Sequence, residues 1–338
     1  MRLNKTYIRI DFYHVWKYIR LTRWQKEKIK WILFSNFSFL FNRFANYQQW
    51  KNAQVFRSKW KSLSVRSIQN DSRNKFLQDT NFHKDSESID QLAIILHVFY
   101  LDIFEEIIRK ISTLTHPDIK LFITCPENLH NSVYQLANKT SFLFFILDVE
   151  NLGRDILPFI KILPLVIKEN YKVILKIHTK RSNHLNKKNL WHTELFNKLL
   201  ADENVNNIIH VLEQFPQVGM VGPSSHILPM SLYYGGNADM VKKLCNVMNL
   251  NNDQISDLCF VAGSMFYARV DALLPILELG LSESNFEQEN GQIDNTMAHS
   301  VERIFAAGLI SSGYVLIDSD STPNNLSCRI TINHPFTL

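Results

Sequence analysis

Cysteine is scarce in this 338-residue sequence, which contains four: Cys125, Cys245, Cys259 and Cys328. No two of them are spaced as a CxxC pair. This argues against a disulfide-rich scaffold and a structural zinc site, because both need closely grouped cysteines. We therefore expect a protein of a reducing, cytoplasmic compartment.

A long apolar run is also missing. The most apolar stretch, residues 31–41, contains Ser35, Asn36 and Ser38, and Arg43 follows it closely. It is therefore too short and too polar to span a bilayer. Lys and Arg interrupt the apolar stretches near the N-terminus, which is not the pattern of a secretory signal peptide.

Several catalytic signatures are absent as well. The sequence has no GxSxG, no Walker A loop, no HExxH and no GxGxxG. These absences weigh against a serine hydrolase, a P-loop enzyme, a zinc protease and a Rossmann dehydrogenase.

Charge and tryptophan are concentrated at the N-terminus. Residues 1–66 hold 15 Lys and Arg against 2 Asp and Glu, a net charge of +13, whereas residues 67–338 have a net charge of −8. The same 66 residues contain five of the six tryptophans. We predict a basic helical segment over residues 1–66, followed by a polar linker over residues 67–90.

The basic segment has three possible roles. Cations beside indoles suit an anionic membrane surface, and this is the partner we expect. Alternatively, the helices pack on the main domain and their basic faces are only solvated. Nucleic acid is not expected, because no RNA- or DNA-binding module is recognisable, although phosphate contacts and stacking would use similar residues.

From residue 91 the sequence alternates between apolar strands and amphipathic helices. This βαβ pattern predicts a single α/β domain with a mostly parallel central sheet over residues 91–320 and a C-terminal tail over 321–338. The predicted strands cover residues 92–100, 120–125, 142–148, 173–177, 218–221, 260–269 and 314–317. A last long helix is predicted over 291–307.

Two polar clusters follow predicted strands, at the sheet edge where α/β proteins bind ligands. The first contains Asn151, Gly153, Arg154 and Asp155, and suits phosphate or carboxylate through its arginine. The second contains Lys176, His178, Thr179, Lys180 and Arg181, a combination that favours a phosphate or diphosphate. A structural reading stays open, in which Asp155 caps the next helix, Lys176 pairs with a carboxylate such as Asp155, and His178 is a satisfied buried histidine.

Two later segments are further candidates. Gly263 interrupts the apolar run 260–269, which indicates either the close approach of a ligand or a bulge in a core strand. Asp294 is predicted in the first turn of the helix over 291–307, where the helix dipole would keep a catalytic base ionised. Alternatively, Asp294 is only a helix cap. Glu302 and Arg303 are then either ordinary solvated charges or internal ion-pair partners.

Five segments in this order resemble the rhamnan synthesis protein F family of bacterial polysaccharide glycosyltransferases. They are ENLGRDILPF (150–159), VILKIHTKRS (173–182), VGPSS (221–225), GSMFYAR (263–269) and GQIDNTMAHSVERIF (291–305). The resemblance spans most of residues 92–319 and leaves the N-terminal 90 residues outside.

The resemblance implies a GT-A-like nucleotide-sugar transferase. It assigns nucleotide-sugar and diphosphate binding to Asn151, Gly153, Arg154, Asp155, Lys176, His178, Thr179 and Lys180. The general base is Asp294, with Glu302 as the alternative, and the acceptor side has Gly263, Ser264, Met265, Gln292 and His299. Many relatives of this fold bind a divalent metal through Asp-x-Asp after the fourth strand. His178-Thr179-Lys180 stands there instead, which argues against a required Mg²⁺ or Mn²⁺, and we expect cations to neutralise the diphosphate.

We therefore expect an enzyme on the inner face of the plasma membrane. It would move a sugar, with rhamnose as first candidate, from a nucleoside-diphosphate donor to a lipid-linked surface polysaccharide, with inversion. One alternative is a non-catalytic module of similar fold that recruits a polysaccharide assembly complex. Another is a nucleotidyl- or phosphotransferase that uses a nucleoside triphosphate.

Overall fold

The computed structural model describes residues 32–41, 47, 88–115, 118–179, 190–289 and 294–331. The chain divides into two units, residues 1–71 and 72–338, which are described separately. The described part of the first unit includes the short helix α3 (Ser38–Phe41), which buries none of its residues. Most of the predicted basic segment and of the linker after it lies outside the described residues, so the proposed membrane contact is not addressed by the structure.

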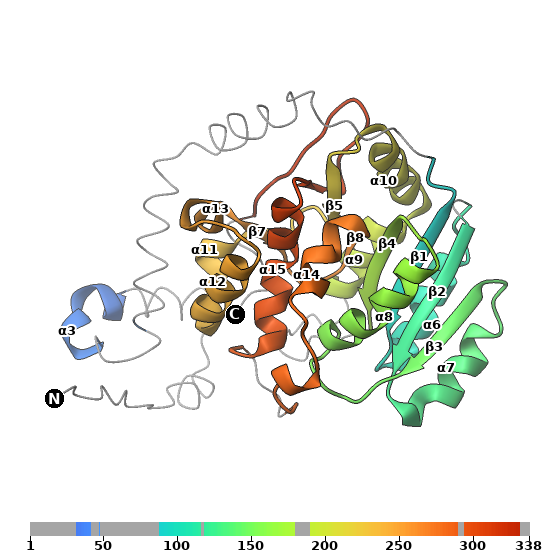
Figure 1. Cartoon of the computed structure of the whole chain (residues 1–338), viewed down its shortest axis with the longest axis horizontal. Coiled ribbons are helices and arrows are strands. Elements are labelled where there is room, and N and C mark those ends of the chain that lie inside the picture. The colour runs from blue at the N-terminus through green and yellow to red at the C-terminus, as the bar shows by residue number, and fades with distance from the viewer. Residues whose placement is uncertain are drawn as a thin grey trace. The chain divides into compact units, whose positions relative to one another are not determined.

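The second unit is built on a seven-stranded sheet in the order β3-β2-β1-β4-β8-β5-β9 (Figure 1). All neighbouring strands run parallel except β8, which is antiparallel to both β4 and β5. This confirms the predicted α/β class with a mostly parallel sheet. The strands are β1 (Gln91–His97), β2 (Asp118–Cys125), β3 (Leu143–Asp148), β4 (Val173–His178), β5 (Val218–Gly222), β8 (Phe266–Arg269) and β9 (Val315–Asp318).

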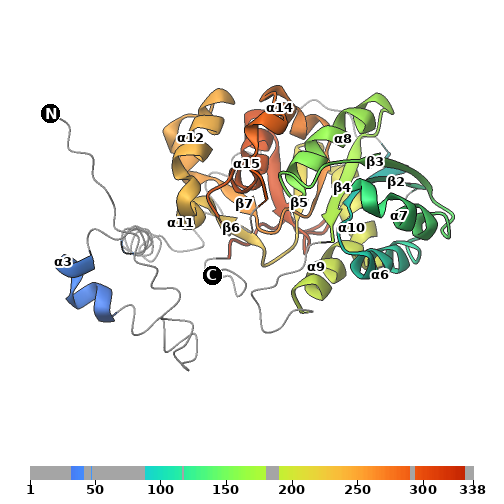
Figure 2. The ribbon, with the colours of Figure 1, turned by 90° about the horizontal axis from the view of Figure 1, so that it is seen from below.

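Helices cover both faces of the sheet, as Figure 2 shows from below. One face carries α6 (Leu101–Ile111), α7 (His130–Ala137), α9 (Leu190–Leu200) and α10 (Asp202–Gln214). The other carries α8 (Ile156–Lys168), α12 (Ala238–Val247), α14 (Leu274–Glu278) and α15 (Met297–Ser311). Each helix presents an apolar stripe, and burial of these stripes forms one core on each side of the sheet.

Smaller elements complete this unit. A two-stranded antiparallel sheet pairs β6 (Ile227–Pro229) with β7 (Cys259–Val261). Short helices are α11 (Met230–Tyr233), α13 (Asn252–Asp257) and the 3-10 turns η1 (Glu127–Leu129), η2 (Gly235–Asn237), η3 (Asp271–Leu273) and η4 (Glu283–Asn285). No helix in the described ranges is long and apolar enough to cross a membrane.

The predicted strand over residues 260–269 is wrong as a single strand. It is two strands, β7 and β8, that belong to different sheets and are separated by a turn at Gly263 and Ser264. Both residues have positive φ, +86° and +55°, which breaks an extended conformation. Because β8 runs antiparallel, this turn lies at the edge of the sheet where the parallel strands β4 and β5 end.

Candidate functional site

The turn before β8 is the centre of the candidate site. The N–H of Ser264 donates to the carbonyl of Val261, with Gly263 third in the four-residue turn. Its φ of +86° is in the region that favours glycine. Ser264 continues in the left-handed region, which is unusual for a residue with a side chain. The backbone is thus strained at a place where predicted site residues meet.

Lys176 reaches this turn from β4 and is fully engaged there. Its ammonium lies 2.5 Å from a carboxylate oxygen of Asp155 and 2.8 Å from both the carbonyl and the hydroxyl oxygens of Ser264. Only 1% of the residue is exposed. Its Nζ also lies 5.4 Å and 5.8 Å from the ring centroids of Phe159 and Phe305, within the range of a cation–π interaction. The structure therefore shows the alternative in which Lys176 pairs with the carboxylate of Asp155.

His178 and Glu302 hold the same turn from two other directions. The Nε2 atom of His178 lies 2.8 Å from the carbonyl oxygen of Gly263, so this nitrogen carries the proton. The backbone N–H of Gly263 donates to a carboxylate oxygen of Glu302 on α15, at 2.9 Å. Side chains from strand β4 and helix α15 thus both contact the Gly263–Ser264 turn that leads into β8.

The loop that precedes α8 supplies Asp155 and Arg154. Asp155 occupies the N-cap position of α8, but its side chain makes no capping hydrogen bond because the carboxylate turns toward Lys176. The predicted cap is therefore wrong. Arg154 has a left-handed φ of +58° and keeps about a fifth of its side chain exposed, with its Nε 3.7 Å from Glu289. Arg154 is thus far more accessible to an anion than Lys176.

Gly153 adopts a φ of +66° in this loop. A Cβ at this position would lie 2.6 Å from the Cβ of Leu157 and 2.7 Å from Cδ1 of Phe286. Neither contact is possible without movement of the backbone or the ring. Glycine is therefore required here for both conformation and space. The neighbouring Asn151 is exposed.

The ends of β1 and β2 add a polar row that the sequence reading missed. His97 is the neighbour of Thr124 on one side and of His178 on the other in the register of the sheet. Its Nδ1 lies 2.9 Å from the Thr124 hydroxyl. Burial, together with repulsion from Lys176, outweighs attraction by Asp155 and lowers the pKa of His97 to about 4. His97 is therefore a neutral imidazole at physiological pH.

His97 was missed because it stands within an apolar run, which we predicted as one strand over residues 92–100. The strand ends at His97, and the polypeptide then turns away. The hydroxyl of Thr179 stabilises this turn by accepting hydrogen bonds from the N–H groups of Phe99 (2.7 Å) and Tyr100 (3.0 Å). Thr179, a predicted ligand residue, is buried.

Asp294 lies in a separate cluster. Its carboxylate accepts hydrogen bonds from the N–H of Gly236 at 2.9 Å and the side-chain amide of Asn237 at 2.5 Å, and lies 3.3 Å from Arg303. Burial opposes ionisation of Asp294, but Arg303 and the hydrogen bonds outweigh it and hold the pKa below its ordinary value. The side chain stays ionised at neutral pH. The sequence analysis did not identify Gly236 or Asn237 as partners.

The predicted position of Asp294 in a helical turn is wrong. Helix α15 begins at Met297 and is capped by Thr296, whose hydroxyl accepts the N–H of His299. Asn295 has a φ of +66°, so the right-handed helix cannot extend back to Asp294. His299 is buried, and its Nδ1 lies 2.7 Å from the Thr296 hydroxyl.

The structure thus brings together Asp155, Lys176, His178, Gly263, Ser264 and Glu302, and leaves Asp294 elsewhere. Met265 is buried in the core beside this group. Lys180 and Gln292 lie outside the described residues. Direct contact of Lys176 with a diphosphate stays a prediction, and it would require one of three hydrogen bonds to be exchanged.

Polar side chains at the end of β4 and in the loop before α8 are engaged by protein groups. The Asp155 carboxylate is taken by Lys176, and Nε2 of His178 by a carbonyl. Across the described ranges, no group of three or more His, Cys, Asp or Glu side chains is arranged to hold a metal ion.

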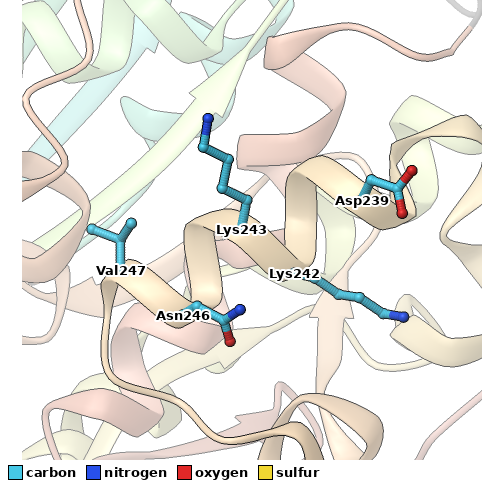
Figure 3. A pocket seen from close by; sticks show the side chains of 5 residues that line it. All are labelled: Asp239, Lys242, Lys243, Asn246 and Val247. Atoms are coloured by element: carbon cyan, nitrogen blue, oxygen red, sulfur yellow. The ribbon is translucent and has the colours of Figure 1, made fainter.

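A pocket of about 500 Å³ lies apart from this network (Figure 3). Its described lining comes from one helix, α12: Asp239, Lys242, Lys243, Asn246 and Val247. None of the residues predicted for the site lines it.

A family model described as Rhamnan synthesis protein F matches residues 44–314. The chain belongs to this family. The match begins at residue 44, which corrects our expectation that the first 90 residues lie outside the resemblance.

Curated relatives extend the comparison. The chain is 34% identical over 230 residues to "Uncharacterized protein WxcX" from two strains of Xanthomonas campestris pv. campestris. The aligned part covers 68% of this chain and 33% of the relative, so the chain spans about a third of that protein.

Two solved structures are similar at 9% identity. One is the mannosyltransferase PcManGT from Pyrobaculum calidifontis in complex with GDP-Man and Mn²⁺, with a TM-score of 0.35 over 68% of this chain and 56% of that one. The other is 4-diphosphocytidyl-2C-methyl-D-erythritol synthase from Anaerococcus prevotii, with a TM-score of 0.36 over 74% of this chain and 94% of that one.

Proposed function

We propose that this protein is a glycosyltransferase. It transfers a sugar from a nucleoside-diphosphate donor to a lipid-linked surface polysaccharide by a single displacement with inversion. Membership of the rhamnan synthesis protein F family carries the proposal and makes rhamnose the first donor sugar to test. The position of the polar network at the ends of parallel strands supports it, because ligands of open α/β sheets bind there.

The donor diphosphate is assigned to the loop between β3 and α8. Glu150, Asn151 and Arg154 are accessible polar side chains there. Of these, Arg154 is assigned to the diphosphate, because a guanidinium binds phosphate oxygens in a planar, bidentate manner. The neutral His97 can exchange hydrogen bonds with an uncharged hydroxyl or amide of the donor, since one ring nitrogen donates and the other accepts.

The general base is assigned to Asp294. A base in this displacement must be ionised before it accepts the proton of the acceptor hydroxyl, and Arg303 and Asn237 keep Asp294 ionised. About a third of its side chain is exposed, so an acceptor can reach it.

The acceptor is proposed to be presented at the inner face of the plasma membrane. The cationic, tryptophan-rich residues 1–66 would hold the protein there by contact with anionic headgroups.

A donor screen followed by a transfer assay tests the proposal. A nucleotide sugar that binds should raise the melting temperature, and it should then be consumed when the acceptor is added. Asp294→Asn keeps the side chain's shape and should lower kcat by about 100-fold or more. Asp239→Asn, an exposed acid on α12, is the matched control and should remain active.

Three results would contradict the proposal in different ways. Binding of no nucleotide sugar would favour the non-catalytic module, and turnover of a nucleoside triphosphate would favour a phosphotransferase. Full activity of Asp294→Asn would reject the assigned base and leave the reaction itself intact. Complete loss of transfer on chelation, restored by Mn²⁺, would reject diphosphate neutralisation by side chains alone.

A further inference from the structure

Charged side chains from two separate elements contact the same two residues, and a third charged side chain pairs with one of them. Lys176 comes from β4, Asp155 from the loop before α8, and Glu302 from the second turn of α15. The first binds both oxygens of Ser264, and the third accepts the N–H of Gly263. We call Gly263–Ser264 and these three side chains the turn clamp.

The ammonium of Lys176 is engaged by protein oxygens in this arrangement. An ammonium has three donors, and three acceptors lie within 2.8 Å of its nitrogen: one oxygen of Asp155 and two of Ser264. Its nitrogen also lies beside the rings of Phe159 and Phe305, which pack edge to face against each other. Lys176 therefore acts on the turn and does not reach solvent.

The turn needs such support because its backbone is strained. Ser264 has a φ of +55°, a conformation that costs energy for a residue with a Cβ and persists only when the surroundings enforce it. The turn lies between β7 and β8, at the sheet edge assigned to the substrates. A strained turn that several charged side chains hold at a substrate-binding edge is typical of a site whose geometry is fixed before the substrate binds.

We propose that the Lys176–Asp155 pair and Glu302 are positioning residues that hold the Gly263–Ser264 turn for catalysis. They are then neither diphosphate ligands nor the general base. The inference rests on the proposed function, because positioning has meaning only for a reaction at this edge. It replaces the direct roles that the sequence predicted for Lys176 and Glu302.

Glu302 allows a clean test, because its amide analogue keeps the acceptor. Glu302→Gln retains an oxygen for the Gly263 N–H and should keep most of the activity, whereas Glu302→Ala loses the acceptor and should lower kcat by about 100-fold. The donor KM should change little in either variant. Equal, large losses of kcat in both variants would identify Glu302 as the base and overturn the inference.

The buried pair is tested by replacing both partners together. Removal of one charge leaves the other buried without a partner, so Lys176→Met alone should destabilise the fold strongly. The double variant Lys176→Met with Asp155→Leu places apolar groups beside Phe159 and Phe305 and should fold, since Asp155 makes no capping bond. Its melting temperature should match that of Lys172→Met, an exposed control.

We expect the double variant to bind the donor and to lose about 100-fold in kcat, because the turn is no longer anchored. If the double variant keeps the wild-type kcat, the Lys176–Asp155 pair contributes only to packing and not to catalysis. Loss of donor binding with a normal melting temperature would make Lys176 a ligand. Either result would overturn the inference.

Amide hydrogen exchange separates this inference from the proposed function. Exchange of the segment 259–269 should accelerate in Glu302→Ala and in the double variant, and not in Glu302→Gln. If the exchange rate of this segment is unchanged in both variants, the turn clamp is rejected, whatever their transfer activity. If the wild-type protein transferred no sugar while exchange behaved as expected, the proposed function would fail and the clamp would stand.

Discussion

We expect this protein to lose stability in mild acid because of His97. The folded protein keeps the ring neutral, with a pKa of about 4 against 6.5 for an ordinary histidine. The principal cause is burial, to which the ammonium of Lys176 adds repulsion. The unfolded chain therefore takes up a proton first as the pH falls, and that proton favours unfolding.

The magnitude follows from the two pKa values. A difference between 6.5 and about 4, at about 1.4 kcal/mol for each pH unit, corresponds to about 3 kcal/mol in the free energy of unfolding. The loss begins near pH 6.5 and is complete near pH 4. The residue as a whole is half-buried, so about 3 kcal/mol is the upper bound.

Urea denaturation at about pH 7 and about pH 4.5 measures the effect, with most of the loss complete at the lower value. His97→Asn has no titratable ring and can still bond Thr124, so its stability should fall less between these pH values. His210→Asn, on the exposed side of α10, should fall as much as the wild type. If His97→Asn and the wild type lose the same amount, the buried, neutral state of His97 is refuted.

Two further predictions concern the loop before α8 and the N-terminal segment. Gly153→Ala should destabilise by about 2 kcal/mol or more, because its Cβ would clash with Leu157 and Phe286. Gly280→Ala, at a φ of +62° with nothing within 4 Å, should cost only about 1 kcal/mol, and equal losses in thermal melts would contradict the steric argument. The full chain should sediment with anionic vesicles and stay free of neutral ones at low salt, and a chain lacking residues 1–66 should not; indifference to lipid charge would contradict the membrane proposal.

The alternation of strands and helices was sufficient to predict the fold class. The stretch that became β4 is apolar except for Lys176 and His178, and such a run favours a strand that is buried on both faces, as all six residues of β4 are. The direction of β8 was not predictable in the same way. A short apolar run has the same composition in a parallel and an antiparallel strand, so its direction depends on the connection before it.

The sequence predicted which residues belong to the candidate site better than it predicted what each of them does. Lysine in a buried strand requires a partner, which is why a pair of Lys176 with Asp155 was foreseen as an alternative. The contacts of Glu302 and His178 with Gly263 were not foreseen. Both are made with backbone atoms, which every residue has, so no residue type in the sequence indicates them. Asp294 was misplaced because Asn295 and Thr296 make the helix begin later, at Met297, than its apolar periodicity suggested.

The antiparallel strand β8 also determines how long one edge of β4 stays unpaired during synthesis. Lys176 and its partner Ser264 are 88 residues apart in the chain, a separation that takes on the order of 10 s to translate. For that interval β4 can pair with β1 but has no neighbour on its other side. Its six residues are all buried in the finished protein. The nascent chain therefore presents an open apolar edge until β8 emerges, and misassembly with another chain would begin at this edge.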